Sequence, residues 1–293
     1  MKHKRQGWVF DTVNTIIMGI VIVIMLFPFL HILAISLNEA RDSAAGGIGI
    51  WPRIFSTDSF EAVFRYQGIL ESFLVSAART IVGTMITLIV TSVASYVMTK
   101  KNLVFYKGFY RFFIASMFIS GGLIPTFILY KQIGLYNSFL VYVLPGAFSV
   151  FYMILFRTYF IQLPKEIEES AFLDGAGELT IFVRIMLPLS LPILATIGLF
   201  VAVSQWNSWQ DTLFFTSDPK LQTLQFVLMK VLRQAEAASM AKRTRSLLRN
   251  TISITPESIK MAITIVATIP ILLVYPFLQK YFVKGIVVGA VKG

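Results

Sequence analysis

A polar stretch interrupts the fifth long apolar run of the chain and carries groups that could bind a sugar. It reads "SQWNSWQD" and covers residues 204–211. On one helix, Trp206 and Trp209 would share a face at i, i+3, and Asn207 and Asp211 would share another at i, i+4. Indole faces beside amide and carboxylate groups suit the C–H faces and hydroxyl edges of a sugar. An aromatic belt with helix–helix hydrogen bonds explains the same residues equally well.

The remaining residues offer little for catalysis. Asp211 alone does not make a general acid/base pair. Cysteine is absent, and His3 and His31 are the only histidines, which leaves little scope for a metal site. The chain also lacks a G-x-x-x-x-G-K-[ST] loop, so phosphates have no cradle. We therefore expect that this chain is not an enzyme and that it binds no metal and no cofactor. A membrane-embedded enzyme is the disfavoured alternative.

The composition is that of a membrane protein. Hydrophobic residues make up 56% of the chain and charged residues only 14%, which is too few to form a soluble surface, and 26 residues are phenylalanine. The mean hydropathy is +0.73. The net charge of +11 favours anionic lipid head groups as partners. Nucleic acid is not expected, because the basic residues are spread over many loops.

Six apolar segments are long enough to span a bilayer, which takes about 20 residues. The first is too long for a signal peptide and is read as a retained span. In the spans, Arg79 is expected to snorkel to the head groups, and His31 to be a hydrogen-bonded packing residue. The sequence thus predicts an all-α membrane protein with a single domain over 1–293 and spans at 13–37, 73–98, 112–130, 139–156, 189–215 and 261–282.

The basic residues predict the orientation. Lys2, Lys4 and Arg5 precede the first span, and another basic group follows the second span, so both termini are placed in the cytoplasm. The loop between spans five and six departs from this rule, because it is basic and would lie outside. It could attract an anionic sugar such as a uronate oligomer, dock an acidic binding protein, or contact anionic lipid. Its basic cluster consists of Lys242, Arg243, Arg245 and Arg249.

Residues 164–188 predict two short helices outside the bilayer. Pro164 suits the first turn of a helix, and the glutamates after it favour the positive end of the helix dipole. Gly175 is a natural helix end that needs positive φ. The second helix is expected from about Glu178 to Leu187, with Pro188 ending it. Its predicted apolar stripe consists of Leu179, Phe182, Val183 and Met186.

The surface of this pair suggests a protein partner. An amphipathic helix lying on lipid should be rich in Lys and Arg on its polar face, and the first half of this pair is acidic. A lipid-bound re-entry loop remains the alternative.

Three motifs in this region resemble the "EAA" loop of ABC importer permeases. They are Glu169-Ser170-Ala171, Asp174-Gly175-Ala176 and Leu187-Pro188, with Ser170 in place of the usual alanine. The later "WNSW" and the tail "PILLVYPFLQKYFVKGIVVGAVKG" resemble the second permease subunit of the carbohydrate-uptake branch, especially members that import complex oligosaccharides. An alginate importer permease is a possible closer match. The resemblance covers about residues 73–293.

The resemblance implies a type I importer permease fold, with a core over 73–283 and a coupling loop over 164–188 that docks on a cytoplasmic ATPase. ATP and Mg would be bound by two partner ATPase subunits. A second permease, expected to be non-identical, and a solute-binding protein would complete an oligosaccharide importer in the inner membrane of a bacterium. An ABC permease for another solute, such as a peptide, is the alternative. The implied coupling residues are Glu168, Glu169, Ala171, Asp174, Gly175, Ala176, Leu187 and Pro188.

Two further sites follow from the same resemblance. The translocation path would include Trp206, Asn207, Trp209 and Asp211, although the partner permease can hold most of the sugar contacts. The tail 284–293 would reach between the two ATPases, although a frayed end is the plainer explanation. The tail residues concerned are Lys284, Gly285, Gly289 and Lys292.

Overall fold

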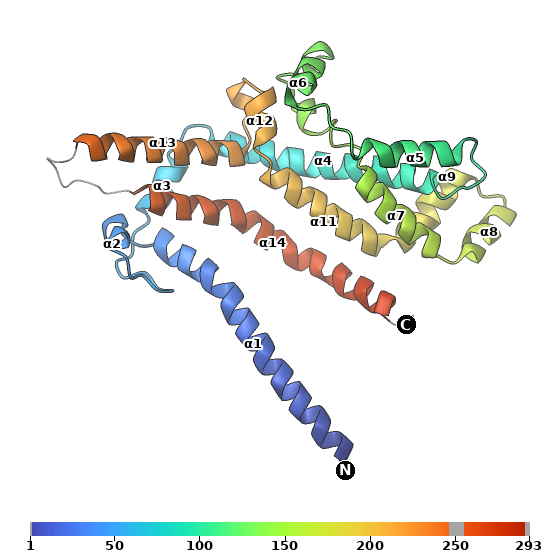
Figure 1. The fold of residues 1–293 in the computed structure, drawn as a ribbon, viewed down its shortest axis with the longest axis horizontal. Coiled ribbons are helices and arrows are strands. Elements are labelled where there is room, and N and C mark those ends of the chain that lie inside the picture. Colours follow the sequence, from blue (N-terminus) through green and yellow to red (C-terminus); the bar gives the residue numbers. More distant parts are fainter. Residues whose placement is uncertain (1, 246–254, 291–293) are drawn as a thin grey trace. The chain divides into compact units, whose positions relative to one another are not determined.

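The computed structural model describes residues 2–245 and 255–290, and all regular elements there are helical, as expected. Figure 1 shows them in chain order. The elements are α1 (Lys2–Ser36), α2 (Ala40–Ala44), α3 (Asp58–Phe64), α4 (Ile69–Val97), α5 (Tyr106–Ser116), α6 (Leu123–Gln132), η1 (Phe139–Tyr142), α7 (Val150–Gln162), α8 (Lys165–Leu173), α9 (Glu178–Ile181), η2 (Phe182–Met186), α10 (Leu187–Leu189), α11 (Leu191–Asn207), α12 (Gln210–Phe215), η3 (Pro219–Leu221), α13 (Leu224–Arg245) and α14 (Pro256–Ala290).

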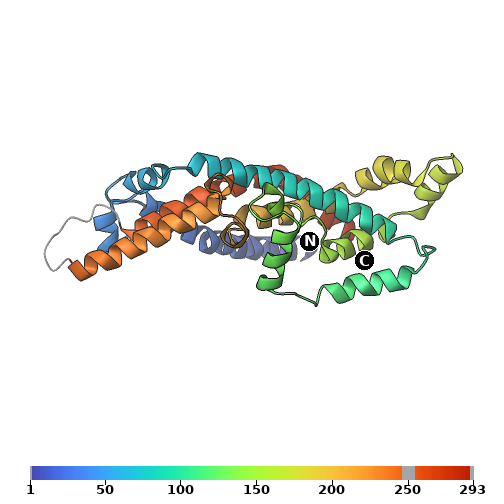
Figure 2. The same cartoon turned by 90° about the horizontal axis from the view of Figure 1, so that it is seen from above.

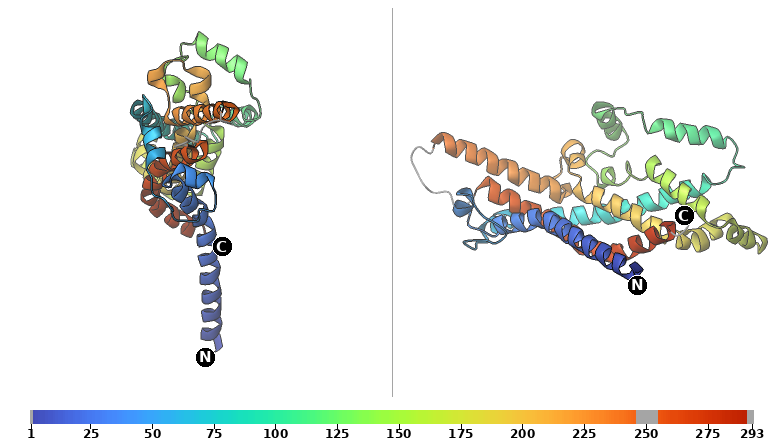
Figure 3. Two further views of the ribbon diagram at one scale, coloured as in Figure 1. Left: turned by 90° about the vertical axis from the view of Figure 1, so that its left-hand side faces the viewer. Right: turned by 60° about the horizontal axis from the view of Figure 1, so that its bottom comes forward.

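The helices group into two compact units, so the expectation of one domain stays a prediction. Unit 1 comprises Met1–Gln67 and Leu228–Pro270, and unit 2 comprises Gly68–Val227 and Ile271–Gly293. In unit 1, α1 is a single long helix (Figure 3). The segment after it folds back, so that Ile48 packs with Ala34 and Ile35 of α1 and with Met261 of α14.

Buried Asn38 fixes the loop that follows α1. Its Oδ1 accepts hydrogen bonds from the backbone amides of Arg53 (2.7 Å) and Ile54 (2.9 Å), and its Nδ2 donates to Asp42 (2.9 Å). The hydrogen bond from Asn38, together with the Arg53 guanidinium, holds the pKa of Asp42 below its usual value although partial desolvation opposes them. His31 Nδ1 lies 2.8 Å from the Gly49 carbonyl oxygen, so the hydrogen bond predicted for His31 is present.

Unit 2 is built around α4, which packs against α11 and α7 (Figures 1 and 2). The buried side of α4 is small and polar, and its exposed side is apolar. This inside-out pattern is expected where lipid covers the outside and small residues let helices approach closely. The buried side consists of Ser72, Ser76, Arg79, Gly83, Thr87, Thr91 and Ser95.

By length and composition, three helical segments of the described residues could cross a membrane: Phe10–Ser36, Ile69–Val97 and Pro256–Val274. A fourth would be the bent pair Glu178–Leu189 and Leu191–Asn207. Three predicted spans match single helices (13–37, 73–98 and 261–282), and six spans are not confirmed.

The third and fourth predicted spans are not continuous helices. Segment 112–130 is interrupted between α5 and α6, where Gly122 has φ +79°, outside the helical range. Segment 139–156 consists of the short 3₁₀ turn η1, a non-helical connection containing Pro145, and the first part of α7. Gly122 directly precedes α6, and Pro145 lies between η1 and α7, so both residues lie in the interruptions.

Candidate functional site

The predicted helix pair is present, and Gly175 makes the turn between its members. α8 begins directly after Pro164, and Gly175 has φ +82°. The amide of Ala176 donates to the Ala171 carbonyl (3.0 Å) and the amide of Gly175 to that of Phe172 (3.1 Å). These two bonds form a Schellman motif, whose left-handed position favours glycine. Ala171 and Ala176 pack on a cluster of buried side chains in unit 2 and so anchor the turn. We call it the apolar cluster; its buried members are Tyr96, Phe156, Phe160, Ile181, Phe182, Met186, Ile197 and Val201.

The second helix runs further than predicted. It continues from Glu178 through Pro188 to Leu189, and the chain bends by 80° at Ser190 into α11. The π turn η2 ends at Met186, two residues before Pro188, and covers the preceding turn, in which a proline removes an α-helical hydrogen bond and its ring clashes with a carbonyl. The helix therefore ends at Leu189, two residues beyond the predicted last residue, Leu187.

The π turn also changes which side of this helix is buried. An α-helical stripe would bury Leu179 and Val183, but these are 75% and 50% exposed. Phe182 and Met186 of the predicted stripe are buried as expected, and Ile181 takes the place of the other two, because a wider turn brings positions five residues apart, such as Ile181 and Met186, onto one side.

Lys100 joins both helices of the pair to the end of α4. Its Nζ contacts Glu168 Oε1 on α8 and lies 2.8 Å from Glu178 Oε2 on α9. The Tyr96 hydroxyl donates to Glu178 (2.6 Å), and the Lys100 ammonium lies 4.6 Å from the centre of the Tyr96 ring. Burial lowers the pKa of Lys100, but hydrogen bonds to Glu168 and Glu178 outweigh it and raise the pKa above its usual value. We call these four residues the Lys100 cluster.

The predicted coupling residues fall into two groups, those with contacts inside the chain and those that are exposed. Glu168 is engaged within the chain, and Leu187 is half-buried on the apolar cluster. Glu169, Asp174 and Pro188 are exposed. The sequence reasoning did not single out Lys100, because its partners lie 68 and 78 residues away and no local pattern reveals them.

The exposed surface of the pair carries large apolar side chains among its acidic ones. Leu173 is 88% exposed and Phe172 is 62% exposed, beside the exposed Leu179. A cavity of about 720 Å³ is lined by α8 and by residues 99–102. Large exposed apolar side chains that lie together are typical of sites that contact another protein or a membrane.

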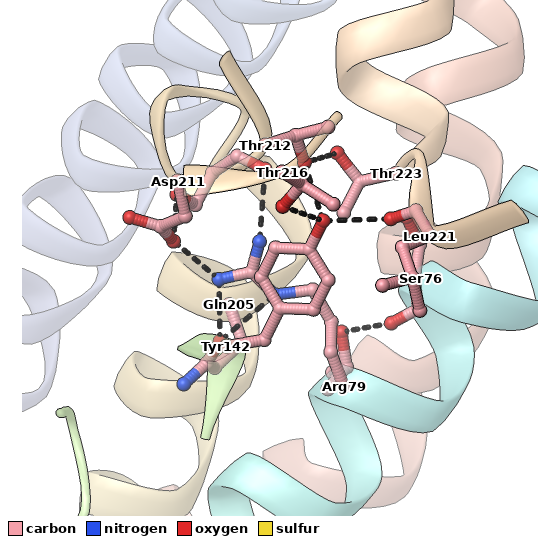
Figure 4. A network of polar contacts seen from close by, with 11 residues as sticks. Ser76, Arg79, Tyr142, Gln205, Asp211, Thr212, Thr216, Leu221 and Thr223 are labelled. Atoms are coloured by element: carbon pink, nitrogen blue, oxygen red, sulfur yellow. Dashed lines mark hydrogen bonds and ion pairs between the residues drawn. The ribbon is translucent and has the colours of Figure 1, made fainter. Parts of the chain in front are cut away.

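A second polar site lies at the break between α11 and α12, where Arg79 is buried (Figure 4). Its guanidinium donates to Asp211 Oδ2 (2.7 Å), to Gln205 Oε1 (2.9 Å) and to the Ser208 carbonyl (3.3 Å). The prediction that Arg79 snorkels to the head groups is therefore wrong. Asp211, which lies 132 residues later in the sequence, neutralises the positive charge of Arg79.

Tyr142 extends this network to neighbouring elements. The Arg79 guanidinium lies 4.6 Å from the centre of the Tyr142 ring, and the Tyr142 hydroxyl donates to the Leu221 carbonyl (2.6 Å). The same hydroxyl contacts Thr212 and Thr216 of the α12 region (Figure 4). The network therefore holds the broken end of span five against α4 and η1.

The predicted sugar-binding faces do not form, because the helix breaks at Ser208 and Trp209. Trp206 is buried and meets Phe73 edge-on, with ring centres 5.8 Å apart. Trp209 lies in the break before α12. Asn207 is exposed beside Gln225, whereas Asp211 points to Arg79. The i, i+3 and i, i+4 pairing required one continuous helix, so the prediction of two shared faces is wrong, whereas the place of these four residues in the translocation path stays a prediction.

A side chain at Gly83 is expected to destabilise the network. A Cβ there would lie 2.8 Å from Gln205 Nε2 and 3.0 Å from Gln205 Cδ, so the Gln205 amide, whose oxygen accepts two hydrogen bonds from Arg79, would have to shift. Weakening bonds to a charged group costs about 1–3 kcal/mol. Gly83→Ala should lower the free energy of unfolding by that amount, measured by denaturation in detergent. Gly19→Ala, with no atom within 4 Å, is the control, and equal stabilities would contradict the expectation.

The remaining predicted residues stay predictions. Lys284, Gly285 and Gly289 lie within α14, which continues to Ala290, and Lys292 lies outside the described residues. Lys242, Arg243 and Arg245 lie in the last turns of α13, and Arg249 lies outside the described residues.

The family model and the relatives that match this chain describe transport proteins or their permease subunits, apart from LplC, whose name gives no function. Residues 92–288 match the family model described as "Binding-protein-dependent transport system inner membrane component". The chain is 38% identical to Protein LplC of Bacillus subtilis over 294 residues, covering 100% of this chain and 98% of LplC. It is 35% identical to the polygalacturonan/rhamnogalacturonan transport system permease protein YtcP of the same organism, covering 92% and 93%.

Among solved structures, the chain resembles one from a bacterial ABC transporter involved in the import of the acidic polysaccharide alginate. The TM-score is 0.78 and the identity 28%, with 95% of this chain and 98% of the other covered.

Proposed function

This chain belongs to the family of binding-protein-dependent transport system inner membrane components, and from that premise we propose that it forms half of the translocation path of an ATP-driven oligosaccharide importer. The observation that carries the proposal is the family match together with the helix pair at 164–188. The pair has a fixed turn at Gly175 and an exposed apolar tip. A peptide as solute is not favoured, because YtcP and the alginate transporter are named for carbohydrate polymers.

The topology that we propose has six spans and both termini in the cytoplasm. α1, α4 and α14 would each cross the bilayer as one helix. α5 with α6, η1 with α7, and α11 with α12 would make the other three as interrupted spans. Irregular backbone at membrane depth is tolerated where it is covered by protein, so such spans need the second permease beside them.

We propose that α8 docks on a cytoplasmic ATPase. Phe172 and Leu173 would supply the apolar contact, and exposed Glu169 would face a basic group. ATP and Mg would stay on two ATPase subunits, because this chain has no phosphate-binding loop. One chain with one coupling loop engages one ATPase, so a second permease, expected to be non-identical, is required. A solute-binding protein would deliver the sugar.

The substrate class that we propose is an acidic, uronate-containing oligosaccharide. Alginate and polygalacturonan, for which two of the compared proteins are named, are both uronate polymers. The net charge of +11 would favour an anionic solute by long-range attraction.

The test is ATP hydrolysis by the complete importer in nanodiscs, with its ATPase, second permease and solute-binding protein. Oligogalacturonates, alginate oligosaccharides, neutral malto-oligosaccharides and tripeptides are added separately. We expect a several-fold stimulation by at least one acidic oligosaccharide and none by the tripeptides. Stimulation by neutral sugars alone would overturn the acidic class, and stimulation by tripeptides alone would overturn the sugar.

A further inference from the structure

Helix α8 is held to the rest of unit 2 by few contacts. None of its residues is buried, and a cavity of about 720 Å³ lies between it and residues 99–102. Of its apolar residues, Ala171 is the one that packs on the apolar cluster, within the part of the chain that the structure describes. Few packed side chains therefore oppose a displacement of α8 toward the cavity. A polar contact is needed to hold α8 in place.

The second helix of the pair is attached quite differently. Ile181, Phe182 and Met186 are buried in the apolar cluster. The Tyr96 ring lies 5.1 Å from the Phe182 ring and 6.4 Å from the Phe160 ring. The end of α4 and the α9–η2 segment therefore form one packed body, and α8 projects from it.

The Lys100 cluster bridges this packed body and α8. Lys100 contacts Glu168 on α8 and Glu178 on α9, and the Tyr96 hydroxyl also reaches Glu168 at 3.2 Å. The side chains of Lys100 and Glu168 are only 24% and 26% exposed. A partly buried pair with additional hydrogen bonds holds its geometry better than an exposed ion pair.

We propose that Lys100 is a positioning residue for energy coupling, which holds α8 at a fixed distance from the cytoplasmic end of α4. A displacement of α8 by the ATPase then moves α4, and with it the polar network around Arg79. This inference rests on the proposed docking of α8 on an ATPase. It adds that the mechanical connection passes through one lysine outside the loop motif.

The test measures the distance between α8 and α4 in the assembled importer. The chain has no cysteine, so Glu166→Cys on α8 and Leu74→Cys on α4 give unique sites for spin labels. Glu166 is exposed, and Leu74 is 59% exposed. Double electron–electron resonance is recorded without nucleotide and with ATP and vanadate. With Lys100 in place, we expect one narrow distance distribution that is the same in both states.

Lys100→Gln should broaden this distribution and shift it by several ångströms when ATP is trapped. Glu168→Gln should do the same, and Lys100→Arg should restore the narrow distribution because it keeps the positive charge. Lys107→Gln, an equal loss of charge at an exposed site nearby, is the control and should change nothing.

Two results would overturn the role of Lys100 while leaving the importer intact. One is an unchanged distribution in Lys100→Gln, and the other is a state-dependent distance in the protein with native Lys100, each with the ATPase retained in the complex. Loss of the ATPase from the complex with native Lys100 would instead contradict the proposed docking, and with it this inference.

Discussion

Arg79→Met is expected to destabilise the protein by about 3 kcal/mol, because it removes the positive charge that pairs with Asp211 and the donor of the hydrogen bonds to Gln205 Oε1. Breaking a buried ion pair by removing one partner typically costs about 3–5 kcal/mol. We expect the lower end, because the Arg79 side chain is 2% exposed while that of Asp211 remains 35% exposed. The measurement is the free energy of unfolding in detergent by denaturant titration.

Two variants make this expectation specific. Arg65→Met removes an arginine from an exposed i, i+4 pair with Glu61, whose side chains are 81% and 55% exposed, and should cost less than about 0.5 kcal/mol. Arg79→Met combined with Asp211→Leu should cost less than the sum of the single changes, because no buried charge is left unpaired. A loss from Arg79→Met no larger than that from Arg65→Met would contradict the structural role of the pair.

Leu173→Asp is expected to abolish retention of the ATPase while the chain still inserts and folds. A buried apolar anchor at an interface commonly contributes at least about 2 kcal/mol, which is roughly a 30-fold loss of affinity. Leu173 is 88% exposed in the isolated chain, so the change should leave its own packing intact. The measurement is copurification of the ATPase with the permease in detergent.

The matched control for this experiment is Val104→Asp. Val104 is 72% exposed in the connection between α4 and α5, outside the helix pair. It should retain the ATPase like the unchanged chain. Gly175→Val should lose the ATPase as Leu173→Asp does, since a β-branched residue is strained at φ +82°. Retention by Leu173→Asp equal to that by Val104→Asp would show that α8 is not the principal dock.

The features that the sequence predicted well depend on neighbours along the chain. The turn at Gly175 was predicted because a helix end with positive φ favours glycine. The long helices around segments 13–37, 73–98 and 261–282 were predicted because continuous apolar length is a local property. The turn and the long helices are present in the structure because they depend on local sequence and need no distant contact.

The features that the sequence did not reveal depend on distant contacts or on rare backbone states. The π turn before Pro188, a rare backbone state, was not predicted, and it buries Ile181 where the α-helical stripe had placed Leu179 and Val183. The break at Ser208 separated Trp206 from Trp209 and removed the shared face. Arg79 was assigned to the head groups, because snorkelling needs no partner whereas an ion pair needs one that periodicity cannot identify.

The ion pair between Arg79 and Asp211 also has a consequence for the synthesis of the protein. Ribosomes add about 5–20 residues per second, so on the order of ten seconds separates the two residues as they emerge, 132 positions apart. During that interval α4 must enter the bilayer with an unneutralised arginine, which costs about 2.5–3.5 kcal/mol at the centre of a span. Arg79 lies near the start of α4, where its side chain can reach the interface. Snorkelling thus describes the newly inserted helix, and the buried pair replaces it only when the later helices arrive.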